Sequence, residues 1–216
     1  SLNLLTIEWA NRGLNLWTIE QGVIPMVTGQ ATYPLPDNTI DLLDQVIRQN
    51  NGTTNQIDIN INRISESTYS TIPNKLTQGR PIQVWVNRQT GAANSITATL
   101  SGNITSTDTT ITLSSTAELA SSGFIKIGSE TISYPNISGN QLLNCARGQN
   151  NTTAAAHTSG AAITVQNLPS VNVWPTPNAP GNQYTLVYWR MRRMQDAGDG
   201  VNTQDIPFRF ITAMVC

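Results

Sequence analysis

The only histidine of the chain, His157, is the first residue to consider for acid–base chemistry. It lies in a run of small and turn-forming residues from Thr152 to Gly160. A general base of this kind needs a nucleophile and an orienting carboxylate, and the sequence contains no nucleophile elbow, Walker loop or dinucleotide-binding glycine pattern. We therefore expect a structural role for His157 and no catalytic site.

The acidic residues could support metal binding or glycoside hydrolysis. Asp196, Asp199 and Asp205 form the densest acidic group and could supply oxygen ligands to calcium, but their spacing does not match the EF-hand pattern. Residues 197–200 have the composition of an ordinary turn, which favours a solvated loop. A hydrolytic carboxylate pair depends on a tertiary separation of about 5 to 10 Å, and most of the 13 acids fall in predicted turns. We therefore predict neither a metal or cofactor site nor a glycosidase site.

Two groups of residues are candidates for a subunit interface. Arg190, Arg192 and Arg193 form the one basic cluster, and their planar guanidinium groups could bind a phosphate or a neighbouring subunit. A solvated strand end balanced by the aspartates that follow is an equally weighted alternative. Trp9 and Trp17 lie two helical turns apart, and aromatic residues are enriched at interface centres. A simple core position is the more common alternative for tryptophan.

The composition of the 216-residue chain favours self-association over nucleic-acid recognition. Charged residues make up 12%, about half of the roughly 25% typical of soluble domains. Such a surface fits a chain that is buried against neighbours, because interface cores are depleted in charge. It also fits secreted β modules. A net charge of −1 gives no general attraction to DNA, so sequence-specific DNA binding is not expected.

Targeting and cross-linking signals are also missing from the sequence. Cys145 and Cys216 are far apart and give no support for a disulfide framework or a zinc site. No stretch approaches the length of an apolar membrane span, and the first residues lack the regions of a signal peptide. We expect a soluble chain, assembled in a reducing cytoplasm. Because it begins without Met and stops within an expected helix, we also expect it to be part of a longer polypeptide.

The hydrophobic pattern predicts an α+β fold in which two terminal helices bracket a β-sheet or barrel-like core. An amphipathic helix is expected over residues 2–20, and a last helix from Ile206 onward. Between them, Ile57, Ile59 and Ile61 alternate with polar residues, as a half-buried strand requires. Residues 42–48 and 184–191 are further extended segments.

An insertion is expected within this sheet. Residues 81–87 and 171–175 resemble the two arms of one hairpin, yet about 80 residues separate them, whereas hairpin loops usually have about two to five residues. Between the arms the composition shifts to Ser, Thr, Gly and Ala with short alternating stretches. The sequence therefore predicts a core of residues 1–92 plus 167–216 and a small all-β insertion domain of residues 93–166.

Several stretches of the core resemble the head-to-tail adaptor proteins of short-tailed bacteriophages. They are the Leu-Asn-Leu-Leu helix start with its Trp, residues 29–36, residues 40–44, Gly79-Arg80-Pro81, the run from Tyr188 to Gly198, and residues 205–210. Within the insertion, residues 124–134, Arg147-Gly148 and residues 156–161 resemble a small β module that recurs in phage virion proteins. The resemblance covers about two thirds of the chain and consists of patterns of ordinary residues.

The resemblance implies a non-enzymatic virion protein at the head-tail junction. It implies a homo-oligomeric ring, typically a dodecamer, that contacts the portal protein and the tail nozzle protein while double-stranded DNA passes through its lumen. The alternative is a carbohydrate-binding or glycan-degrading β protein of a phage tail, favoured by the Asn/Thr-rich strands and the five Trp. Exposed coplanar Trp residues would support that alternative.

Overall fold

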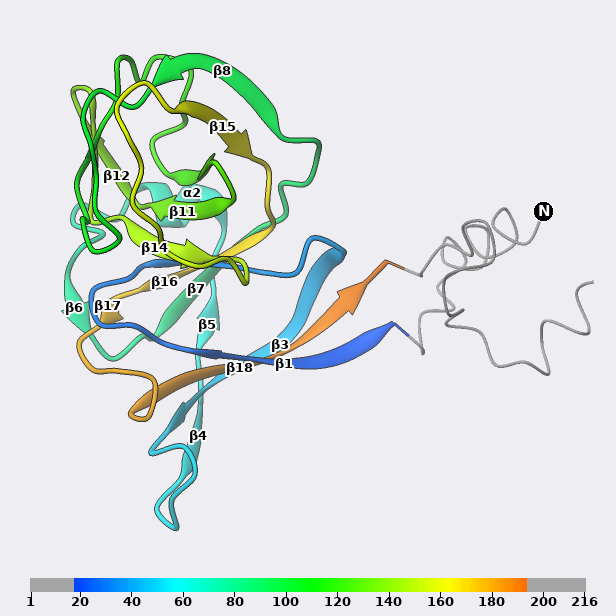
Figure 1. Cartoon of the computed structure of the whole chain (residues 1–216). Helices are drawn as coiled ribbons and strands as arrows, with labels where there is room; N and C mark the ends of the chain where they lie inside the picture. The colour runs from blue at the N-terminus through cyan, green and yellow to red at the C-terminus, as the bar shows by residue number, and fades with distance from the viewer. Residues whose placement is uncertain (1–17, 194–216) are drawn as a thin grey trace, which may run out of the picture.

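The computed structural model describes residues 18–193, and these residues form an almost entirely β structure (Figure 1). Strands hold 49% of the described residues and helix 3%. The short helix α2 spans Glu66–Ser70, and Ser65 caps its first turn by accepting a hydrogen bond from the Thr68 N–H. The α+β class expected from the sequence is therefore wrong, because the described chain is a β protein built from several sheets.

The two bracketing helices are not found within the described residues. Most of the helix expected over residues 2–20, and all of the helix expected from residue 206, lie outside them. Where the first expectation can be compared with the structure, Ile19 and Glu20 belong to strand β1 (Ile19–Pro25) rather than to a helix. Ile19 pairs with Met191 and Glu20 with Arg190, so cross-strand pairing overrides the helical periodicity of this segment.

Four antiparallel strands form the sheet that holds both ends of the described chain, here called the terminal sheet. Its order is β1–β18–β3–β4, with β18 at Tyr184–Arg192, β3 at Thr39–Gln49 and β4 at Ile57–Asn60. Strand β4 confirms the strand expected from the isoleucine alternation. Its expected half-burial is wrong at Ile57, which is 52% exposed because β4 is an edge strand.

A second sheet packs against the terminal sheet across a shared core. Its order is β2–β16–β7–β5, formed by Thr32–Pro34, Ser170–Trp174, Gln83–Asn87 and Asn62–Arg63. Val171 pairs with Val86 and Val173 with Val84, which confirms the pairing expected between these distant segments. A short parallel pair, β6 (Gln78–Gly79) and β17 (Thr176–Pro177), completes this part of the chain.

The strands between residues 94 and 166 pair only with one another. Five form a sheet in the order β14–β11–β10–β15–β8, at Ala146–Gln149, Glu130–Tyr134, Gly123–Ile127, Ala162–Gln166 and Asn94–Thr99. Three more form β12–β13–β9, at Asn136–Ser138, Gln141–Leu143 and Ile111–Thr112. Below, residues 93–166 are called the module, and residues 18–92 with 167–193 the host.

Host and module each have a hydrophobic core of their own. The host cluster joins the terminal sheet to the second sheet and includes Tyr33, Leu42, Ile47, Val84, Val173, Leu186 and Tyr188. The module cluster includes Leu100, Ile111, Ile125, Ile132, Tyr134, Leu142 and Ile163. The module lies over the second sheet, while the terminal sheet extends away from it toward the two ends of the described chain (Figure 1). The surfaces available for function are therefore the module, the joint and the extended terminal sheet.

Candidate functional site

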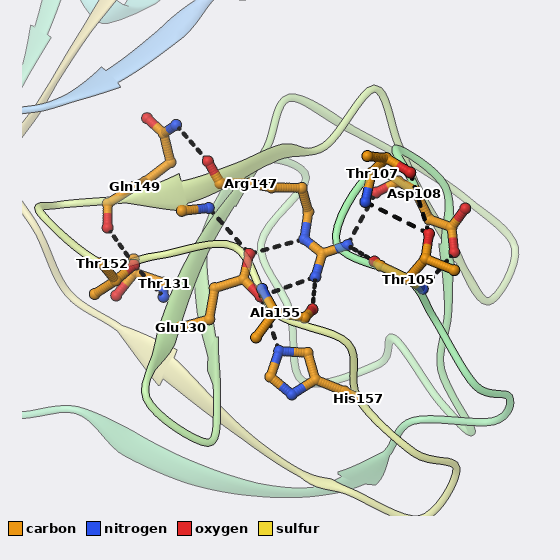
Figure 2. A network of polar contacts seen from close by, with 11 residues as sticks. Thr105, Thr107, Asp108, Glu130, Thr131, Arg147, Gln149, Thr152, Ala155 and His157 are labelled. Atoms are coloured by element: carbon orange, nitrogen blue, oxygen red, sulfur yellow. Dashed lines mark hydrogen bonds and ion pairs between the residues drawn. The ribbon is translucent and has the colours of Figure 1, made fainter.

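Polar residues from separate parts of the module converge on the buried carboxylate of Glu130, at the start of β11 (Figure 2). Its two oxygens accept hydrogen bonds from Nε and Nη2 of Arg147, each at 2.8 Å. The backbone N–H groups of Gly148 and Ala155 donate to the same carboxylate at 3.0 and 3.1 Å. His157 Nε2 lies 2.8 Å from Oε2. Glu130 is 0% exposed, so these partners replace water completely.

Arg147 uses its whole guanidinium group within this network. Besides its two bonds to Glu130, Nη2 donates to the carbonyl of Ala155 at 2.7 Å. Nη1 donates to the carbonyls of Thr105 and Asp108 at 2.5 and 3.2 Å. A guanidinium group has five N–H donors, and the contacts to Glu130 and the three carbonyls account for all of them. Arg147 therefore links β14 to β11 and to two loops.

The backbone around Gly148 brings the network together. Gly148 has a φ of +60°, and a Cβ atom there would lie 2.9 Å from the nitrogen of Ala154 and 3.0 Å from the oxygen of Thr152. Only glycine allows this approach, which places the Ala155 N–H on the carboxylate. Two residues further on, His157 exchanges backbone hydrogen bonds of 2.9 and 3.0 Å with Ile104.

The network keeps the carboxylate of Glu130 ionised. Burial alone would raise the pKa of Glu130, but hydrogen bonds from Arg147, His157 and the two backbone N–H groups lower it to about 2. A buried charge is tolerated only when it is paired and fully hydrogen-bonded, and Glu130 meets both conditions. The carboxylate therefore requires a proton on His157 Nε2, which faces it.

The chemistry available to this arrangement is structural. His157 meets an orienting carboxylate, as a catalytic base would, but none of its side-chain contacts within residues 18–193 is a nucleophile. Both oxygens of Glu130 already accept hydrogen bonds from Arg147, His157 and two backbone N–H groups. Sequence reasoning singled out His157 and predicted a structural role for it, but missed Glu130 and Arg147. The available signal was that both lie in the stretches that resemble the virion β module.

The predicted interface arginines lie at the C-terminal end of β18, where the described residues end. Arg190 Nη2 and Arg192 Nε both donate to the carboxylate of Glu20 on β1, the first at 2.8 Å. The two arginines therefore share one face of β18, as predicted. Burial by itself raises the pKa of Glu20, but Arg192 and Arg190 lower it. Among the described residues, Glu20 is the carboxylate that pairs with Arg190 and Arg192.

Arg190 is the most deeply placed member of the cluster, at 8% exposure. Its Nη1 donates to Asn38 Oδ1 at 2.7 Å and to Thr39 Oγ1 at 2.9 Å. Arg193 is exposed and donates through Nη2 to Thr90 Oγ1 at 3.2 Å. These contacts give Arg190 a role in the host fold, and the interface role of the cluster stays a prediction. Trp9, Trp17 and the aspartates at 196, 199 and 205 lie outside the described residues.

A cleft of about 530 Å³ lies at the joint of host and module, apart from the buried network. The host lines it with residues that include Gln30, Tyr33 and Tyr188, and the module lines it with Gln149 and two asparagines. Gln30 Nε2 donates to Gln149 Oε1 at 3.1 Å across the joint. Amides and tyrosines can offer both donors and acceptors to a neutral polar ligand.

The wider comparisons add no relative to this picture. Comparison of the chain with models of protein families, with curated proteins and with solved structures found no match. Within residues 18–193, no group of three or more His, Cys, Asp or Glu side chains is arranged to hold a metal ion. In the same part of the chain no helix has the length and apolar character to cross a membrane.

Proposed function

We propose that the chain is a non-enzymatic structural subunit of a bacteriophage virion, a head-to-tail adaptor that works by assembling with copies of itself. The ring would lie between the portal protein and the tail nozzle protein, and double-stranded DNA would pass through its lumen. Twelve copies are the number that the family resemblance implies. Assembly would take place in the host cytoplasm, before the subunit becomes part of the head-tail junction.

One observation carries this proposal. The three stretches that resemble a virion β module each contribute one polar side chain to the same buried network: Glu130, Arg147 and His157. Sequence resemblance by chance would not be expected to select residues that meet in space and hold one unit together. The convergence supports the interpretation that these stretches are the fold-determining residues of a shared module.

The character of the surface is consistent with a mechanical role. The charged fraction of 12% suits a subunit that buries much of itself against neighbours. A weakly charged wall also suits a channel for DNA, because each phosphate neutralised by Lys or Arg adds a salt-dependent binding term that would retard the passing duplex. The single histidine has no nucleophile among its described contacts, which supports a role without catalysis.

The cleft at the joint favours one alternative, a carbohydrate-binding protein of a phage tail. Its amides and tyrosines could bind sugar hydroxyls. Two of the three described tryptophans give less support: Trp85 stacks on Tyr69 with ring centroids 5.2 Å apart, and Trp174 donates through its indole N–H to the carbonyl of Asn74. These rings are occupied within the chain, so they do not form the exposed coplanar pair that glycan stacking requires.

Sedimentation velocity and negative-stain electron microscopy of the full-length protein separate the two candidates. The adaptor proposal predicts closed rings with a central lumen, formed at high protein concentration. A monomer at every concentration that binds glycans on an array would contradict it and favour the alternative.

A further inference from the structure

We propose that subunits join head to tail through the two edges of the terminal sheet, with β1 of one copy pairing with β4 of the next. This inference rests on the proposed function, because it specifies the contact by which copies of the chain would assemble. It starts from backbone hydrogen-bonding groups that the described chain leaves unused.

Within residues 18–193, strand β1 is an edge strand with an unused row of backbone groups. Its only neighbour in this part of the chain is β18. Beyond the two ends of this pairing, the Met26 N–H donates to the Tyr184 carbonyl at 3.0 Å, and the Arg192 N–H donates to the Thr18 carbonyl at 2.8 Å. Antiparallel strands alternate the direction of their backbone groups, so residues 18, 20, 22, 24 and 26 face β18. Residues 19, 21 and 23 therefore direct their N–H and C=O groups away from the sheet.

Within the described residues, this edge shows none of the features by which monomeric proteins protect exposed strands. Soluble proteins place lysine, bulges or proline on such edges, or keep the strand short. Strand β1 has seven residues, no lysine and an unbroken register with β18, and its proline is the last residue. Ile19 and Val23 are 43% and 59% exposed. We expect an apolar edge of this kind to pair with another strand when the protein is assembled.

Strand β4 offers the complementary edge on the opposite side of the same sheet. Continuing the alternation through β18 and β3 directs the backbone groups of Ile57 and Ile59 toward β3 and those of Asp58 and Asn60 outward. Ile57, at this edge, is 52% exposed. The charge on Asp58 is paired with Arg48 at 2.8 Å, as the charge on Glu20 is paired on β1. Neither edge would bring an unpaired carboxylate into the contact between two subunits.

Because the terminal sheet has two such edges, a second copy of the chain is the favoured source of the strand that pairs with β1. Pairing β1 with β4 extends the sheet in the same sense at every contact, and such a head-to-tail interface closes into a ring when the rotation per subunit allows it. Pairing of β1 with a second β1 would instead be two-fold symmetric and would stop at two copies. Only the first arrangement is compatible with the proposed ring.

Proline substitutions can block each edge separately. Val23→Pro removes an outward N–H from β1, and Asn60→Pro removes one from β4. Because both N–H groups point away from the sheet, neither change removes a bond within the chain. Tryptophan fluorescence checks that each full-length variant is folded. If Val23→Pro unfolds the chain, Val23→Lys places a charge on the same edge and has the same expected results.

Sedimentation velocity of the variants, alone and mixed, tests the pairing. Each variant alone should remain monomeric, and an equimolar mixture should form a dimer and nothing larger, because it contains one intact β1 and one intact β4. Val23→Thr, which keeps the N–H, should assemble like the wild type. Rings formed by either proline variant, dimers of Asn60→Pro alone, or a mixture that stays monomeric would overturn the inference. A wild-type chain that never assembles would contradict the proposed function itself.

Discussion

Replacing Glu130 by glutamine should destabilise the module by an amount that depends on pH. Folding lowers the pKa of this carboxyl from an ordinary value of 4.5 to about 2, and each unit corresponds to about 1.36 kcal/mol. The linked stabilisation is therefore about 3 kcal/mol. A separate consideration gives a similar figure, since removing one partner of a buried ion pair costs roughly 3 to 5 kcal/mol. At neutral pH, Glu130→Gln should lose about this much free energy of unfolding.

The sign of the pH dependence follows from the lowered pKa. Stabilisation from Glu130 is fully present above pH 4.5, the unfolded pKa, and is lost as the pH falls toward about 2. The difference between wild type and Glu130→Gln should therefore shrink over this interval and nearly vanish at its lower end. Glu118→Gln is the matched control, because Glu118 is an exposed glutamate of the same module, and the Oε1 atom of glutamine can still accept the hydrogen bonds from Thr97. Its effect should stay within about 0.5 kcal/mol.

Hydrogen exchange measured by mass spectrometry, as a function of pH and denaturant, reports on the module directly. All five tryptophans lie outside residues 93–166, so tryptophan fluorescence reports on the host in the same samples. The variant should lose protection in the module while the host transition is largely retained. The reasoning is refuted if Glu130→Gln matches the wild type at neutral pH, or if its deficit does not change with pH.

Three further changes test the division of the chain and the host contacts. Replacing residues 93–166 by an Asn-Gly turn should alter host stability by no more than about 1 to 2 kcal/mol, and loss of the folded circular dichroism spectrum would show that the module belongs to the host core. Gly22→Ala should lower the free energy of unfolding of the host by about 1 to 3 kcal/mol, because the new methyl group would lie 2.3 Å from Cζ of Tyr188. An unchanged melting temperature would argue against this contact. Arg190→Ala should lower the free energy of urea unfolding by about 1 to 3 kcal/mol, because Glu20 would lose one of its two arginine partners. If the variant is as stable as the wild type, Arg190 contributes to assembly and not to the host fold.

Local patterns in the sequence predicted several of the strands but not the fold class. The valines at 84, 86, 171 and 173 pair as their alternation indicated, because period-two patterning directly reflects the two faces of a sheet. The helical periodicity of residues 2–20 misled at its end, because residues 19 and 20 pair with β18 as part of a strand. A stripe of apolar residues in a short segment is compatible with either element, and long-range partners decide between them.

The candidate site was less predictable than the strands. Glu130 and Arg147 are separated by 17 residues and Glu130 and His157 by 27, and no spacing rule links positions on different strands and loops. The shared face of Arg190 and Arg192 followed from strand geometry. Their partner Glu20 could not be foreseen, because it lies in a segment expected to be helical. Sequence therefore identified individual polar residues, whereas tertiary pairing determined which of them meet.

Labelling of intact virions with antibody fragments against the chain, viewed by electron cryomicroscopy, tests the central claim most directly. The adaptor proposal predicts label at one site only, the vertex where the head meets the tail. Label distributed over the capsid, confined to the tips of tail fibres, or missing from purified virions would contradict the proposal.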